Sequence, residues 1–108
     1  MTPGRLDRVT VQLSGKRTHV LKWEEREALL DRLYAVAGGG RIAKLFREVG
    51  ASRPVELDDL ERLALYGAIS AWGVAHAAGR NVQPVPYGVL QLRQALAIDL
   101  DRHVHVAR

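Results

Sequence analysis

Hydrophobic residues recur at two different spacings along the chain, and these spacings divide it into a short β region followed by helices. Every second residue from Val9 to Leu13 is hydrophobic, which is the period of a half-buried strand. A Ser-Gly pair then supplies turn residues, and residues 17–22 resume a run rich in β-forming side chains. The pattern therefore predicts a hairpin of residues 8–13 with residues 17–22.

Four later segments carry hydrophobic residues three and four positions apart, as amphipathic helices do. The triple glycine at residues 38–40 is expected to end the first segment, because glycine adopts the left-handed conformation at a helix C-terminus at low cost. Asp58 and Glu61 have the spacing of a capping box at the start of the third segment. Residues 103–106 alternate and are interpreted either as a frayed end or as a terminal strand. The predicted helices cover residues 23–37, 41–49, 58–78 and 87–103.

One pattern of spaced residues occurs twice. Residues 21–33 and residues 57–69 both read L-x-x-x-E-R-x-A-L-x-x-x-[LI], and each copy follows a β-leaning segment and opens a helix. The segment before the second copy, residues 55–57, is predicted as a short third strand, which Pro54 would confine to a sheet edge. The pattern indicates a strand-into-helix unit used twice; chance resemblance between two amphipathic helix starts is the alternative.

These elements predict an α+β fold that is mainly helical. An N-terminal β-hairpin, with an optional short edge strand near residues 55–57, packs against four helices. The length of 108 residues is that of one domain, so residues 1–108 are expected to form a single unit.

Composition removes several classes of function. The chain has no cysteine, which excludes disulfides, thiolate catalysis and cysteine-ligated metals. His103 and His105 could share one face of a strand, but a metal site needs three or four ligands, and the other two histidines belong to other elements. No serine lies in a nucleophile motif and no phosphate-binding motif is present. We therefore expect no enzymatic activity, no catalytic residues, no cofactor and no bound metal.

No hydrophobic run approaches the length of about 18 residues that a membrane helix requires, and the N-terminus lacks the hydrophobic region of a signal peptide. A soluble cytoplasmic protein without a membrane partner is the expectation.

The second half of the third predicted helix is rich in small residues. Two glycines lie inside it, and each costs about 0.5–1 kcal/mol relative to alanine. Close packing against another helix, within the fold or across a dimer, would offset that cost. We therefore expect a small non-enzymatic interaction module, homo-oligomeric or part of a larger complex. Trp72 has burial in the core as an alternative role. The predicted interface residues are Tyr66, Gly67, Ala71, Trp72 and Ala75.

The distribution of charge supports an alternative function. The formal net charge is +4, and the excess lies in residues 1–22. Glycine at the start of a basic helix, as at residues 38–47, can also bind anions. The alternative is therefore binding of nucleic acid or of an acidic partner protein, although six aromatic residues are few for stacking on bases. An ordinary solvated surface explains the same charges. The contact residues in this alternative are Lys16, Arg17, Lys22, Arg41, Lys44 and Arg47.

Overall fold

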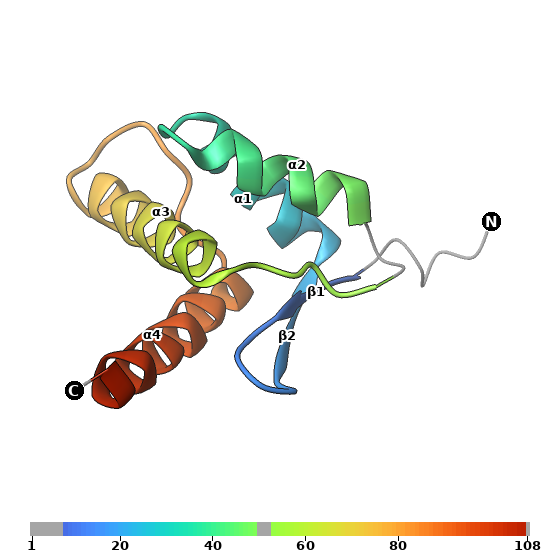
Figure 1. The fold of residues 1–108 in the computed structure, drawn as a ribbon. Helices are drawn as coiled ribbons and strands as arrows, with labels where there is room; N and C mark the ends of the chain where they lie inside the picture. The colour runs from blue at the N-terminus through green and yellow to red at the C-terminus, as the bar shows by residue number, and fades with distance from the viewer. Residues whose placement is uncertain (1–7, 50–52, 108) are drawn as a thin grey trace.

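The described part of the chain forms a short hairpin and four helices, as the sequence predicts. The computed structural model describes the backbone of residues 8–49 and 53–107, and the side chains of residues 8–48 and 53–101. Helices α1 and α2 lie above the hairpin in Figure 1, and α3 and α4 lie beside it. The elements are β1 (Arg8–Gln12), β2 (Thr18–Lys22), α1 (Trp23–Tyr34), α2 (Gly39–Val49), α3 (Asp59–Ala77) and α4 (Tyr87–Ala107). The α+β, mainly helical class is confirmed.

Strand β1 lies between two neighbours. It pairs antiparallel with β2 on one side, and on the other side Val55 forms a parallel bridge with Val11. The N–H of Gln12 donates to the Val55 oxygen at 2.9 Å, and the Val55 N–H donates to the Thr10 oxygen at 2.7 Å. The third strand predicted near residues 55–57 is thus present as one bridged residue at the sheet edge. Val9 and Val11 are fully buried, which confirms the alternation along β1.

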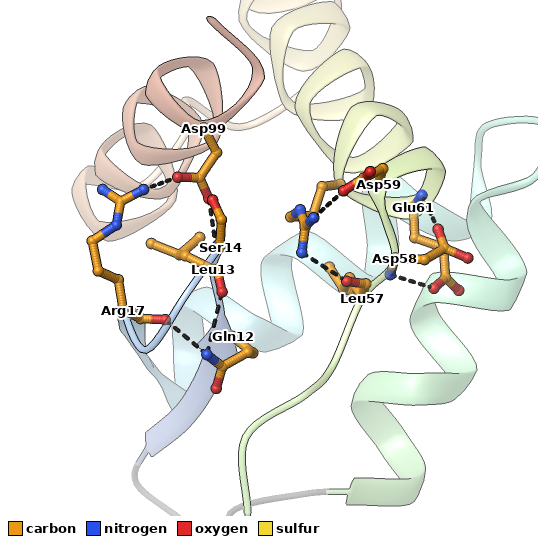
Figure 2. Close-up of polar contacts among 10 residues, drawn as sticks. Gln12, Leu13, Ser14, Arg17, Leu57, Asp58, Asp59, Glu61 and Asp99 are labelled. Carbon is orange, nitrogen blue, oxygen red and sulfur yellow. Dashed lines mark hydrogen bonds and ion pairs between the residues drawn. The ribbon is translucent and has the colours of Figure 1, made fainter. Parts of the chain in front are cut away.

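The two copies of the repeated pattern begin their helices in the same way. The Lys22 N–H donates to the side chain of Glu25 at 2.9 Å, and the Asp58 N–H donates to the side chain of Glu61 at 3.0 Å. Figure 2 shows the second of these boxes, in which Asp58 also accepts the Glu61 N–H at 2.7 Å. The leucine that opens each copy is buried. Each copy therefore is a capped helix start, and the extended segments that lead into them flank β1 on its two sides.

Every helix and both strands contribute to one hydrophobic core. The helical period explains this, because each helix turns one apolar stripe inward. The largest fully buried side chains are Trp72, Phe46, Leu21, Leu29, Leu33, Ile42, Leu65, Ile69, Leu92, Leu96, Val9 and Val11.

The joint between α1 and α2 differs from the prediction. Helix α1 ends at Tyr34 and not at residue 37, and α2 begins at Gly39 and not at residue 41. Of the three adjacent glycines, only Gly38 takes the left-handed conformation, with φ of 81°, and it turns the chain into α2. The three glycines therefore have different roles, and two of them belong to the second helix.

The C-terminal helix also differs from the prediction. The backbone of α4 is helical to Ala107, so the alternative of a terminal strand at residues 103–106 is wrong. The buried positions 89, 92 and 96 follow the predicted spacing along this helix.

One carboxylate connects the start of α4 to the start of α1. Besides accepting the Lys22 N–H, Glu25 accepts the N–H of Gly88 at 2.6 Å. His19 Nε2 lies 3.0 Å from the Gly88 oxygen and adds a contact from β2. A Cβ atom at position 88 would overlap the Glu25 carboxylate, so alanine there would push aside the end of that side chain.

Replacing Gly88 with alanine is therefore expected to destabilise the protein by about 1–2 kcal/mol, because the displaced carboxylate loses a charge-assisted hydrogen bond at a helix N-terminus. Urea unfolding followed by circular dichroism measures the change. Gly73→Ala in α3 is the matched control, since no other heavy atom lies within 4 Å of a Cβ built there. It is expected to keep or raise stability, by up to about 1 kcal/mol. Equal losses in both variants would contradict the role of Gly88.

Candidate functional site

The side of α3 that points away from the core exposes hydrophobic residues. Leu60 is 76% exposed, Leu63 is 51% exposed and Val74 is 69% exposed. The residues that lie between them on this side of the helix are small. Positions 60, 64, 67, 71 and 74 are spaced by three and four residues, which places them on one side of a helix. We call this surface the α3 outer face and define it as Leu60, Leu63, Ala64, Gly67, Ala71 and Val74.

No segment of the described chain packs closely on the glycines of α3. A Cβ atom built at Gly67 or Gly73 would meet no other heavy atom within 4 Å, outside its own helix backbone. The expectation that close packing within the fold offsets the cost of these glycines is therefore wrong. The buried side of α3 is the opposite one, where Leu65, Ile69 and Trp72 contact the core.

The structure separates the five predicted interface residues. Gly67 and Ala71 are exposed on the outer face, whereas Tyr66 and Ala75 are half-buried. Trp72 is fully buried, and its Nε1 donates to the Gln83 oxygen at 2.7 Å. Its proposed place at the interface is therefore wrong, and its alternative role in the core is correct. The helical period is the reason, since Trp72 follows Leu65 by seven residues and Ile69 by three.

The same period could have found the residues that sequence reasoning missed. Leu63 lies four residues from Gly67, and Leu60 and Val74 each lie seven residues from it, so all three are on the same side of the helix. The sequence-based prediction of the interface considered the small residues and therefore left out these three large side chains. Each of these large side chains is more than half exposed.

The outer face is uncharged along its length and charged at its two ends. No aspartate, glutamate, lysine or arginine occurs from residue 63 to residue 79. Asp58, Asp59 and Glu61 outnumber the one cation, Arg62, at the N-terminal end of α3, and Arg80 follows its C-terminal end. The two ends of the face therefore carry opposite charge.

The six basic residues of the alternative function lie in separate places. Lys16 and Arg17 belong to the closed end of the hairpin, which points away from α2 in Figure 1. Arg17 forms an ion pair with Asp99 of α4, and Figure 2 shows the two side chains together beneath that helix. Lys22 is the exposed residue at which β2 meets α1.

The remaining three basic residues, Arg41, Lys44 and Arg47, are exposed on α2. Lys44 Nζ lies 3.8 Å from Glu48, and Arg47 donates to the hydroxyl of Tyr34 at 3.1 Å. The fold therefore does not bring the six cations into one patch. Binding of nucleic acid or of an acidic partner through them stays a prediction.

A groove lies between α3 and α4. The sequence did not predict it. Its volume is about 510 Å³. Tyr66 comes from α3 and all other lining residues come from α4, so the groove exists only because the two helices pack together. The lining residues are Tyr66, Tyr87, Leu90, Gln91, Arg93, Gln94 and Ala97.

Within the described residues, no three histidine, aspartate or glutamate side chains cluster in a way that could hold a metal ion. Among the same residues, no helix has both the length and the hydrophobicity to cross a membrane.

Comparison with protein-family models gives no match for this chain, and comparisons with curated proteins and with solved structures give none either. Function is therefore inferred from the side chains of the chain alone.

Proposed function

We propose that the protein is a non-enzymatic assembly module that forms a homodimer through the α3 outer face. The observation that carries this proposal is the exposed, uncharged side of α3, on which Leu60, Leu63 and Val74 surround small residues. Each exposed hydrophobic side chain gains about 25 cal/mol for every Å² that a partner removes from water. Contiguous exposed hydrophobic patches are typical of protein interfaces.

The small residues permit a close contact between two helices. Helix axes approach to about 8 Å only where the side chains at the crossing are small. Ala64, Gly67 and Ala71 provide such a stretch in the middle of the outer face. The large side chains near its ends would then flank the crossing helix of the second copy.

A second copy with α3 antiparallel to the first fits this surface best. Leu60 and Val74 are each seven residues from Gly67, so a twofold axis near Gly67 places Leu60 of each copy beside Val74 of the other. The acidic N-terminal end of one α3 then lies near Arg80 of the other copy, where opposite charges attract. A parallel pairing would instead bring like charges and like helix ends together.

Val74→Glu is expected to convert the dimer into a monomer, because a carboxylate at this position would lose its hydration in the interface. Sedimentation velocity at about 50 µM protein, above the micromolar Kd of a weak complex, should give twice the chain mass of 12.0 kDa for the unchanged protein. The variant should sediment at the single chain mass. Far-UV circular dichroism checks that both remain folded.

Val20→Glu is the matched control, since Val20 is 49% exposed and belongs to β2. The control should remain a dimer. A monomeric unchanged protein at this concentration would refute the proposal, and so would a dimer that survives Val74→Glu.

A further inference from the structure

The groove between α3 and α4 combines aromatic, amide and cationic side chains with no acidic one. Tyr87 is 74% exposed, and Gln91 Nε2 donates to its hydroxyl at 2.8 Å. Leu90, 42% exposed, lies one turn further along α4. A large ring and an aliphatic side chain are thus exposed to solvent at the same groove, and one of them is held in place by a hydrogen bond.

Arg93 supplies the charge of the groove. Its guanidinium carbon lies 6.0 Å from the centre of the Tyr66 ring, within the range of a cation–π contact. Its Nε atom is buried and has no hydrogen-bond partner among the described residues. Arg93 is the one cationic residue among those that line the groove, so an anion bound there would pair with its guanidinium.

Two other arginines also have a buried Nε without a partner, so this feature alone does not mark a ligand site. Arg26 donates through its terminal nitrogens to Glu27 at 2.6 Å and to the Phe46 oxygen at 3.4 Å. Arg32 lies in the last turn of α1, where the helix dipole favours a cation. Arg93 is the seventh residue of α4, far from its C-terminal end. What distinguishes Arg93 from the other two is that it lines the groove.

We propose that the groove binds a small aromatic carboxylate, whose carboxylate pairs with Arg93 and whose ring packs on Tyr87 and Leu90. A planar guanidinium matches the two oxygens of a carboxylate. An aromatic ring gains from covering the exposed ring and the leucine, because both side chains leave water. The volume of about 510 Å³ is in the range of small-molecule sites. The absence of acidic lining residues removes the repulsion that an anion would otherwise meet.

Titration of the ¹⁵N-labelled full chain with 2-naphthoate tests the proposal. Backbone amide shifts should change saturably within residues 87–97 and at Tyr66. The neutral analogue 2-naphthamide should bind at least about tenfold more weakly, as expected for the loss of one charged pair worth about 1.4 kcal/mol. Acetate, which has the charge without the ring, should also bind at least about tenfold more weakly.

Arg93→Gln should weaken 2-naphthoate binding at least about tenfold and leave 2-naphthamide binding unchanged. Arg53→Gln is the control, because Arg53 is exposed and does not line the groove. If Arg93→Gln does not fold, Arg93→Lys keeps the charge but not the planar fork and should give intermediate affinity. Equal affinity for the acid and the amide overturns the proposal. Unchanged binding by the Arg93 variant, or phosphate binding as tight as 2-naphthoate binding, also overturns it.

Discussion

Replacing Arg17 with methionine should destabilise the protein more than replacing its partner Asp99 with asparagine. The Asp99 side chain is 3% exposed, whereas the Arg17 side chain is 41% exposed. Loss of Arg17 leaves a buried carboxylate whose remaining partner, among the described residues, is the Ser14 N–H at 2.9 Å (Figure 2). Loss of the Asp99 charge leaves a cation that water can hydrate, and asparagine still accepts from Ser14. We expect a loss of about 2–3 kcal/mol for Arg17→Met and about 1–2 kcal/mol for Asp99→Asn.

The double variant makes this prediction sharper. Arg17→Met combined with Asp99→Asn removes the buried charge altogether, so it should be more stable than Arg17→Met alone. Urea unfolding at neutral pH measures all three variants. Arg53→Met is the control, because Arg53 is exposed, and it should change stability by less than about 0.5 kcal/mol. A double variant less stable than Arg17→Met would show that the ion pair does not anchor the hairpin to α4.

Two adjacent glycines at the start of α2 should respond to alanine in opposite ways. A Cβ atom at Gly39 would overlap the carbonyl oxygen of Leu33 and lie 2.8 Å from Val36 Cγ2. The overlap is with backbone, so the joint between α1 and α2 would have to open. Gly39→Ala should therefore lower the free energy of unfolding by about 2–3 kcal/mol, as overpacking does.

Gly40→Ala is the internal control for this prediction. Nothing lies within 4 Å of a Cβ atom at Gly40, and the residue is already helical. Alanine should raise stability by about 0.5–1 kcal/mol because of its helix propensity. Thermal unfolding should then show the Gly39 variant well below the unchanged protein and the Gly40 variant at or above it. Similar melting temperatures for the two variants would contradict the close contact at Gly39.

The α3 outer face and the α3–α4 groove are separate surfaces, and their tests are independent. Gly67 and Ala71 belong to the first, and Tyr66 to the second. Sequence reasoning assigned all three to one interface, because they are close neighbours along the chain. Residues next to each other in a helix point about 100° apart, and here that angle separates a proposed dimer contact from a proposed ligand contact.

Local patterns predicted the elements well. The hairpin, the four helices, the capping box of Asp58 with Glu61, and the edge position of Val55 all follow from residues a few positions apart. These features depend on alternation, helical period and hydrogen bonds between near neighbours, which a sequence displays directly. The end of α1 was predicted three residues too late, because a run of three glycines does not indicate which of them adopts the left-handed conformation.

Contacts between distant segments could not be predicted in this way. Asp99 follows Arg17 by 82 residues, and Gly88 follows Glu25 by 63 residues. The spacing of residues along the chain does not indicate such a pair, because the two residues meet only when the packed core places two helices and a turn side by side. The sequence thus determined which segments are helix or strand and which helix is rich in small residues. Only the tertiary structure decided that Arg17 has a partner and that one side of α3 remains uncovered.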